Sequence, residues 1–348
     1  HHLVGDGWSW GVLLAELRLA YEAHRQNRMP ALAPLPAQYP DVARWQREHL
    51  DLSAERRYWG EQLRDLPSLL ALPTDRPRPA LQSHAGASLT LDLGTNLQAR
   101  VERFARRRGL TAFMVLYGAF VVLLHRYSGA TDIAVGTPIA NRPRPEMEPL
   151  IGCFVNTLVL RTRLSPGIDG EALLARVRDT ALAAYAHQSL PFEALVEQLN
   201  PPRSLAHHPL FQVMFSLLNT PVQVTDLAEI AVTPLAQDAG TAQFDLNLTL
   251  EPAGDGLHAH LAYRTELFQH DSMARLLGHY RCLLEGILDD PTRPVDALPL
   301  LDGAESRQFQ QWNATAVDYP ETGTGLAQLL EARARLSPEA PALVVAER

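Results

Sequence analysis

Apolar side chains recur at helical spacing from the tenth residue onward. Trp10, Leu13, Leu14, Leu17 and Tyr21 share one face of such a helix, so the pattern predicts an amphipathic helix directly after the opening HHLVGDG. A proline-rich stretch, MPALAPLPAQYP, separates it from a second helical pattern in DVARWQREHLDLSAERRYWGEQL. Prolines interrupt the pattern again in PTDRPRP, residues 73–79, which predicts a linker that crosses between two lobes.

Strand and helix patterns alternate after this linker. Apolar or alternating runs predict strands in ASLTLDL, DIAVGTPIA, NTLVLRTRL and LFQVMFSLLN, and the segments FDLNLTLE and GLHAHLAYR around PAGDG predict a hairpin. Helical spacing predicts helices from Asn96 to Arg107, from Leu110 to Leu124, over GEALLARVRDTALAAYAHQ, and in a last segment with Met273, Leu276, Leu277, Tyr280, Leu283, Leu284 and Ile287. This mixed order predicts an α/β fold, built as an α+β sandwich in which helices cover a sheet.

The pattern changes after Pro299. A polar linker, a short amphipathic helix and a hydrophobic strand that ends at Arg348 indicate the start of another domain. We therefore expect three parts: the remainder of a first lobe at 1–72, a second lobe at 73–298, and a linker with the first elements of a further domain at 299–348. With an apparent site at its first residue and a strand cut at its last, the chain is expected to be truncated at both ends.

Composition narrows the class of partner. The 348 residues are 46% hydrophobic and 20% charged, with a formal net charge of −8, which gives no electrostatic reason to expect nucleic acid or an anionic membrane. The most apolar run, Leu110 to Leu124, is shorter than the about 20 residues that span a bilayer. Two cysteines, Cys153 and Cys282, make no disulfide framework and fit a reducing cytosol. The arginine clusters at 106–108 and 142–144 are interpreted as a solvated helix end and a polar loop.

The opening HHLVGDG holds the strongest candidate chemistry. One of the two histidines is expected to face a cavity while the other supports it, because an imidazole near its ordinary pKa of ~6.5 can take a proton from an attacking amine, alcohol or thiol. Asp6 can fix the loop through an internal ion pair, and Gly7 lets the backbone approach a substrate without a Cβ. The following helix offers N-terminal N–H groups to a developing oxyanion.

Other interpretations of these residues were weighed. Adjacent residues in extended chain point to opposite faces, so His1 and His2 do not readily bind one metal ion, and no metal site is expected. In a plainer alternative Asp6 only caps the helix and the histidines are packed polar residues. His207 and His208 are expected at a strand entrance, and the pair 258 and 260 on the solvent face of a hairpin. Because no G-x-S-x-G elbow occurs and neither cysteine stands in a nucleophile motif, direct transfer with histidine assistance is favoured over a covalent acyl-enzyme.

The motifs resemble, in order, those of the condensation domains of nonribosomal peptide synthetases. HHLVGDGWS resembles that family's HHxxxDGWS core, and the later segments that resemble its motifs are YPDVARWQ, GTPIANR, IGCFVNTLVLR, HQSLPFEALVEQL and HHPLFQVMF. This ordered set covers nearly all of residues 1–300. The tail, WNATAVDYP followed by LAQLLEARARLSPEAPALV, resembles the linker and first elements of an adenylation domain.

The resemblance implies a chloramphenicol-acetyltransferase-like fold of two lobes in a V with a tunnel between them. The family's N-terminal part would precede His1, so the first lobe is expected to be incomplete, and the fragment to expose apolar surface and to be inactive alone. The implied activity is amide-bond formation by attack of an acceptor amine on a donor thioester. Both substrates would be carried on the 4′-phosphopantetheine arms of upstream donor and downstream acceptor peptidyl carrier domains, with no directly bound cofactor, an adenylation domain C-terminal in the same chain, and a cytoplasmic location.

The resemblance also assigns roles to single residues. His2 matches the histidine credited with assisting amine attack, as a base or by positioning, next to His1. Asp6 matches a residue that forms a structural salt bridge, for which Arg142 is the expected partner. Gly7 belongs to the same motif. The residues expected at the substrate tunnel or shaping its loops are Trp8, Ser9 and Asn156.

The chain also departs from the family pattern. Ser189 replaces the usual aspartate, and 206–208 differ from the commoner polar residues. Both histidines of the core motif argue against cyclising relatives, and PLFQVMF with the following tail argues against an epimerisation domain, whereas L- and D-configured donors both stay open. Two alternative functions are an ester-forming HHxxxDG acyltransferase, which would not lead into an adenylation-like tail, and a non-catalytic carrier-docking domain, which has no need for an intact His2–Asp6 pair.

Overall fold

A computed structural model describes residues 1–218, 230, 232, 240–317 and 325–341. By its internal contacts the chain forms two compact units, His1–Asp302 and Gly303–Arg348. The first unit contains the sheet, the buried core and all the candidate site residues. The proposed division of this unit into two lobes at residue 72 stays a prediction.

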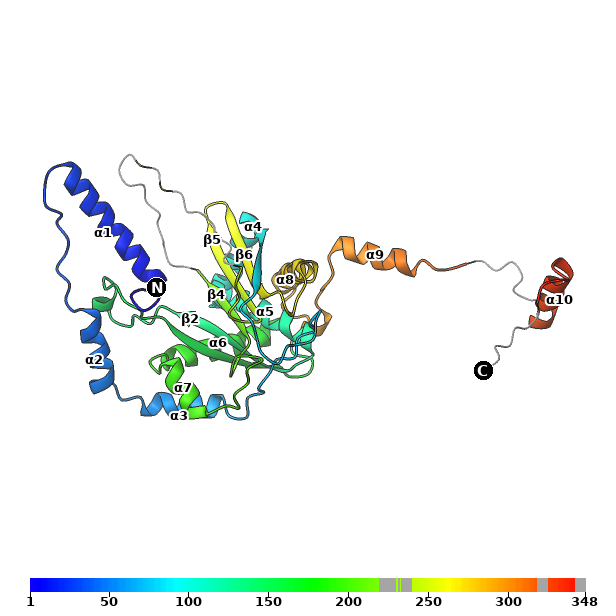
Figure 1. The fold of residues 1–348 in the computed structure, drawn as a ribbon, viewed down its shortest axis with the longest axis horizontal. Helices are drawn as coiled ribbons and strands as arrows, with labels where there is room; N and C mark the ends of the chain where they lie inside the picture. Colours follow the sequence, from blue (N-terminus) through cyan, green and yellow to red (C-terminus); the bar gives the residue numbers. More distant parts are fainter. Residues whose placement is uncertain (219–229, 231, 233–239, 318–324, 342–348) are drawn as a thin grey trace. The chain divides into compact units, whose positions relative to one another are not determined.

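A six-stranded mixed sheet forms the framework of the first unit (Figure 1). In chain order its strands are β1 Gly86–Leu93, β2 Asp132–Ile139, β3 Asn156–Arg163, β4 Val213–Leu217, β5 Leu246–Ala253 and β6 Gly256–Arg264. They lie in the order β1-β6-β5-β4-β2-β3. Strand β4 runs parallel to both β2 and β5, and the other neighbouring pairs are antiparallel. The predicted hairpin is confirmed as β5 and β6, with Ala253 opposite Gly256.

Four helices cover this sheet. They are α4 Gly94–Arg108, α5 Ala112–Ser128, α6 Gly170–Ala186 and α8 His270–Asp289, and α5 packs against the other three and against β2. All side chains of α5 from Met114 to Leu124 are buried, as expected for a helix that is apolar on every side. Thr111 begins α5 by accepting the Met114 N–H at 3.3 Å, and Gly129 ends it in the left-handed conformation. The predicted layered α+β architecture is thus confirmed.

Strand alternation decides which side chains enter the core. Leu246, Leu248 and Leu250 of β5 are fully buried, while Asn247 and Thr249 between them are half-buried. In β6 the predicted solvent-side histidines, 258 and 260, do alternate with buried residues, and each imidazole pairs with a carboxylate, Asp255 at 3.0 Å and Glu251 at 3.2 Å respectively. The period-two pattern therefore placed these strands correctly.

The segments that surround the site lie before and between these elements. They are α1 Gly7–Arg25, α2 Tyr39–His49, α3 Ser53–Gln62, α7 Phe192–Leu199 and the 3₁₀ turns Pro145–Met147 and Val295–Ala297. A small apolar cluster of Val42, Met147, Leu150 and Phe154, with Tyr39 and Trp45 against it, joins α2 to the segment that precedes β3. This cluster fixes one wall of the site described below.

Two sequence-based element bounds were wrong. The second helical pattern forms two helices rather than one, because the Asp51 carboxylate accepts the Ser53 N–H at 2.9 Å and its hydroxyl at 2.6 Å, which starts a new helix. Pro191 lies just before α7, as its N-cap, and not at the first helical position; of its predicted core side chains, Leu195 is buried and Phe192 is half-buried.

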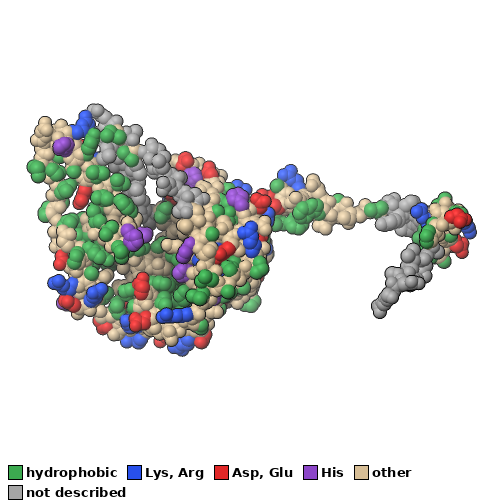
Figure 2. Space-filling model, in the orientation of Figure 1, with side chains coloured by type: hydrophobic (Ala, Val, Ile, Leu, Met, Phe, Trp, Pro, Cys, Tyr) green, Lys and Arg blue, Asp and Glu red, His purple; other side chains and the backbone are tan. Residues whose placement is uncertain are grey.

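Helix α1 presents an apolar face to solvent. Only Ser9 and Ala23 of its side chains are buried, while Trp10, Leu13 and Leu17 are exposed. Figure 2 shows hydrophobic side chains gathered over this helix. The predicted amphipathic pattern is present, and in the described residues its apolar side does not face the core.

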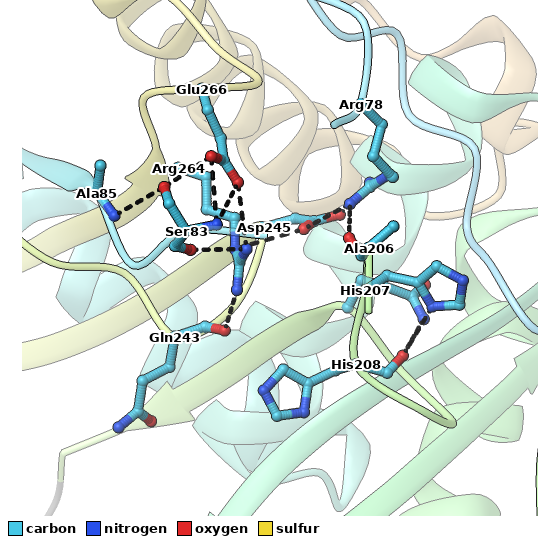
Figure 3. A network of polar contacts seen from close by, with 11 residues as sticks. Arg78, Ser83, Ala85, Ala206, His207, His208, Gln243, Asp245, Arg264 and Glu266 are labelled. Carbon is cyan, nitrogen blue, oxygen red and sulfur yellow. Dashed lines mark hydrogen bonds and ion pairs between the residues drawn. The ribbon is translucent and has the colours of Figure 1, made fainter. Parts of the chain in front are cut away.

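A buried polar network joins the chain before β1 to the ends of three strands (Figure 3). Arg78 and Arg264 both contact the Asp245 carboxylate, the first at 3.1 Å and the second at 3.7 Å. Arg264, only 1% exposed, also donates to the Ser83 and Gln243 carbonyls. Two guanidinium groups on one buried carboxylate hold the predicted linker segment against the sheet.

The second unit contains α9 Gly303–Asn313 and α10 Leu326–Leu336, neither of which has a buried residue. The short amphipathic helix expected here corresponds to α10, and the strand expected near Arg348 lies outside the described residues. Across the described ranges, no single helix has the length and apolarity to cross a membrane; α4 and α5 would reach them only together, and they meet at 105°.

Candidate active site

A buried ion pair lies beneath the opening motif. Arg142 Nη2 is 3.2 Å from Asp6 Oδ1, and the two side chains are 2% and 4% exposed. This is the pair expected from the sequence. The interpretation of 142–144 as a solvated polar loop was wrong for Arg142, because burying its guanidinium satisfies a carboxylate that the fold has already buried.

Asp6 also accepts hydrogen bonds from two distant parts of the backbone. Its Oδ1 accepts the Ser9 N–H at 2.9 Å, which caps α1, and its Oδ2 accepts the Phe154 N–H at 2.9 Å. Burial by itself raises the pKa of Asp6, but the hydrogen bonds from Ser9 and Phe154 and the Arg142 charge outweigh burial and lower that pKa below its usual value. Asp6 is therefore ionised at neutral pH and is both a helix cap and half of an ion pair.

Backbone and ring contacts hold the guanidinium of Arg142 in place. Asn141, which precedes it, has a φ of 51°, a left-handed conformation that asparagine tolerates. Arg142 donates to the carbonyls of Met147 and Leu150. Its guanidinium carbon lies 4.1 Å from the centre of the Phe154 ring, close enough for a cation–π contact.

Ser9 and Trp8 extend this support. The Ser9 hydroxyl lies 2.7 Å from Asp6 Oδ1 and 2.8 Å from the Gly152 carbonyl, and it accepts the Gly152 N–H at 3.1 Å. The Trp8 ring N–H donates to the Glu148 carbonyl at 2.9 Å. These contacts tie the start of α1 to the segment 148–154, so both side chains lie in the support of the site.

The two histidines lie in a turn above this support. The Val4 N–H donates to the His1 carbonyl at 3.1 Å, and His1 Nδ1 accepts the Leu3 N–H at 3.2 Å. Both imidazoles line a hollow of about 730 Å³, and Figure 2 shows histidine side chains at the edge of a hollow in this face. His1 is thus tied to its own turn, while His2, which is exposed, has no hydrogen bond or ion pair to another described residue.

Helix α2 supplies a second wall of the hollow. Tyr39 lies so close to Gly152 that a Cβ there would be 2.2 Å from its ring. Its hydroxyl donates to the Cys153 carbonyl at 3.0 Å, and its ring meets Phe154 edge-on with centroids 5.0 Å apart. Burial raises the pKa of Tyr39, so its phenol stays protonated as a donor. Tyr39 was not among the predicted site residues, although it begins the YPDVARWQ motif.

The third wall is the start of β3 with the turn into α7. Asn156 Nδ2 donates to the carbonyls of Gln188 and Leu190 at 3.0 and 2.8 Å, and its Oδ1 accepts the N–H groups of Thr157 and Phe192 at 2.9 and 3.0 Å. Its side chain is buried and lines the hollow. Asn156 therefore shapes this wall, one of the two roles expected for it.

The remaining predicted site residues do not line the hollow. Ser9 is buried, Trp8 is half-buried, and Gly7 is the exposed first residue of α1, where an added Cβ would meet nothing within 4 Å. The Ser9 N–H, one of the helix N-terminal donors suggested for an oxyanion, is already bonded to Asp6. Within the described part of the chain, no three His, Cys, Asp or Glu side chains come together as a metal site would require.

This geometry can be compared with known proteins. The sequence matches the condensation domain family over residues 1–309. The chain belongs to this family. The condensation domain is 47% identical over 354 residues to a linear gramicidin synthase of Brevibacillus parabrevis, a match that covers 100% of this chain and 7% of that protein. It is 39% identical over 356 residues to phosphinothricin tripeptide synthetase PhsC of Streptomyces viridochromogenes, covering 100% of this chain and 32% of that protein. The chain thus spans less than a tenth and about a third of these relatives.

Solved structures agree on the fold. The X-domain from teicoplanin biosynthesis superposes with a TM-score of 0.76 at 29% identity, covering 86% of this chain and 70% of that one. The first condensation domain of the calcium-dependent antibiotic synthetase, in complex with a substrate analogue, superposes with a TM-score of 0.68 at 20% identity, covering 87% and 66%. The predicted chloramphenicol-acetyltransferase-like condensation fold is confirmed.

Proposed function

We propose that this condensation domain joins two carrier-bound substrates through an amide bond. The acceptor's amine nitrogen attacks the donor's thioester carbonyl carbon, a C–N bond forms, and the C–S bond breaks. The amine gives up a proton and the departing thiolate takes one up, so the products are an amide and a free thiol. No oxidant, reductant or metal is needed for this balance.

The position of His2 carries the proposal. Its imidazole lines a hollow of about 730 Å³, in a turn that leads directly into Asp6, and Asp6 is fixed to Arg142 at 3.2 Å and to the Phe154 N–H at 2.9 Å. The ring is thus held at the surface of a cavity by a buried ionic support. An amine meeting a thioester in this cavity finds one imidazole without a partner among the described residues.

Two roles for His2 follow from its chemistry. A free α-amine has a pKa near ~8, so near neutral pH most of it is protonated, and an imidazole can accept that proton. The same ring can instead hydrogen-bond to the attacking nitrogen and hold the tetrahedral intermediate. Both roles need the ring to point into the cavity, and both make the other motif residues supporting groups.

The test uses the intact synthetase with donor and acceptor carriers loaded. Product formation is followed by mass spectrometry for the wild type, for His2→Ala, and for His24→Ala, a control histidine in the last turn of α1 that is not part of the hollow. We expect His2→Ala to lose at least about a hundredfold in rate, the scale of general acid–base catalysis, and His24→Ala to match the wild type. Equal rates for His2→Ala and the wild type would contradict the proposal.

Two other functions give different results in the same assay. An ester-forming acyltransferase would turn over a hydroxyl acceptor faster than the matched amine. A docking domain would give no product, and its binding partner would be retained by His2→Ala; this alternative takes support from the structural neighbour solved as a complex of the X-domain and OxyB. The fixed Asp6–Arg142 support favours catalysis, because a docking surface has no need of it.

The surroundings of the domain belong to the same proposal. The substrates would arrive on the phosphopantetheine arms of an upstream donor and a downstream acceptor carrier domain, and an adenylation domain would follow in the same chain. The match to the linear gramicidin synthase runs through residue 348, past the condensation match that ends at 309, which supports a longer multidomain protein. Both cysteines are free thiols, which suits the cytosol.

A further inference from the structure

The hollow that contains His2 also holds a carboxylate without a partner among the described residues. Glu193 is the only acidic side chain among the described residues that line it. Its side chain is exposed to the hollow and forms no hydrogen bond or ion pair with any described residue. Asp6, the other nearby carboxylate, is buried beneath the surface and fully engaged. Glu193 is therefore the carboxylate that a molecule in this hollow meets.

The fold holds Glu193 at a fixed place on the wall. It is the second residue of α7, and Asn156 accepts the N–H of the preceding Phe192 at 3.0 Å while donating to Leu190 at 2.8 Å. This clamp fixes the first turn of α7 against β3. Glu193 thus projects from an anchored turn.

The charges around the hollow are unevenly placed. Glu193 is close enough to Cys153 that its charge, after burial and the charge of Asp6, helps raise the pKa of the thiol. Arg47, the only arginine among the described lining residues, belongs to α2 and acts on Tyr39. A cation that enters is drawn toward the α7 wall and away from the α2 wall.

We propose that Glu193 binds the protonated amine of the acceptor and orients it toward His2. This inference rests on the proposed function, which brings an amine into the hollow that begins as an ammonium ion. Glu193 forms an ion pair with that ammonium and makes no covalent bond. The proton leaves the nitrogen in the later step that His2 assists, and the neutral amine then attacks.

The expected consequence is a preference for a charged acceptor over a neutral one of the same shape. Two probes test it: the glycyl and the glycolyl amides of aminopantetheine, which differ only in an amine or a hydroxyl at the α carbon. Binding of each to the intact synthetase is measured by calorimetry with no donor loaded. We expect the wild type to prefer the glycyl probe by roughly two- to fivefold, the scale of a solvent-accessible ion pair.

Variants of one helix separate charge from structure. Glu193→Gln should bind the two probes equally and raise the acceptor KM with little change in kcat. Glu193→Asp should keep part of the preference. Glu197→Gln, one turn further along α7 at an exposed position outside the hollow, should behave as the wild type.

The inference and the proposed function can fail separately. Equal affinity of the wild type for both probes, or an unchanged preference in Glu193→Gln, would overturn the role of Glu193 while wild-type amide formation still stands. Absence of wild-type amide product would overturn the function itself. If Glu193→Gln does not fold, the wild-type preference must fall as sodium chloride is raised from about 0.05 to about 0.5 M; a preference that is independent of salt overturns the inference.

Discussion

At the scale of single residues, the opening motif separates into a reactive part and a supporting part. His2 lines the hollow without a partner among the described residues, whereas Asp6 accepts from the Ser9 and Phe154 N–H groups and pairs with Arg142. The plainer alternative, that Asp6 caps the helix, is correct as far as it goes, but the same carboxylate also holds a buried guanidinium. Sequence spacing alone cannot reveal this, because Arg142 lies 136 positions away along the chain.

Replacing Asp6 by alanine should destabilise the domain. Arg142 would stay buried with no counter-charge, a change that costs about 3–5 kcal/mol in the free energy of unfolding. Because the folded pKa of Asp6 is lowered, its contribution is fully present above the unfolded pKa of ~3.9 and is lost as the pH falls through the folded value. Urea unfolding should show a gap between Asp6→Ala and the wild type that is constant from about pH 7 to 5 and shrinks below about pH 4. A gap that widens on acidification would exclude this account.

Two glycines of the site offer a matched pair of substitutions. A Cβ at Gly7 meets nothing within 4 Å, whereas a Cβ at Gly152 would lie 2.2 Å from the Tyr39 ring. We expect Gly7→Ala to unfold within about 0.5 kcal/mol of the wild type and Gly152→Ala to lose about 1–3 kcal/mol as Tyr39 is displaced. Thermal unfolding measures both changes. If Gly7→Ala nevertheless slows product formation by roughly tenfold, the loss reports substrate approach to the backbone; unchanged turnover would remove Gly7 from the site.

At the scale of elements, periodicity was a sufficient guide wherever burial is one-sided or complete. The alternation in β5 and β6 and the all-apolar α5 each match the structure, because a core admits only one register of such patterns. Periodicity failed where a polar side chain overrides it. Asp51 divides one helical pattern into α2 and α3 by bonding to Ser53, and such a local cap has no periodic signal.

Asn156 is the polar side chain that most strongly shapes an element at the site. Its four hydrogen bonds join the start of β3 to the turn that begins α7. Asn156→Ala leaves two carbonyls and two N–H groups without this partner, and we expect it to cost about 2–3 kcal/mol. Hydrogen exchange at the Phe192 amide should then rise, while exchange in α5 follows only global unfolding. Asn156→Asp keeps an acceptor for the Phe192 N–H and should protect that amide better than alanine does; equal protection in both variants would contradict the assigned bonds.

At the scale of the whole molecule, the described first unit is held together by one large apolar core and by polar networks at the strand ends. The core was predictable from the sequence, since its members are the apolar positions of regular patterns. The networks were not, because Arg78 and Asp245 are separated by 167 positions along the chain. The resemblance to condensation domains supplied what spacing could not, including the partner of Asp6.

The network of Figure 3 predicts how the folded unit responds to acid. His208 packs against Phe244 with ring centroids 4.9 Å apart, and burial, with the Arg264 charge and those of His84 and His207, lowers its pKa despite Asp245. The unfolded chain therefore binds a proton at higher pH than the folded one does, so stability falls as the pH drops below the unfolded value of ~6.5.

The matched variant for this prediction is His208→Gln, which cannot take up the proton. The urea midpoint of the wild type should decrease more between about pH 7 and 5.5 than that of His208→Gln. Both midpoints must be measured in one buffer series, because other histidines, such as the one at 258 whose raised pKa stabilises the fold on acidification, contribute equally to both proteins and cancel in the difference. A steeper fall for His208→Gln would show that this ring is charged in the fold, and that the network, rather than excluding a third cation, has the capacity to bind it.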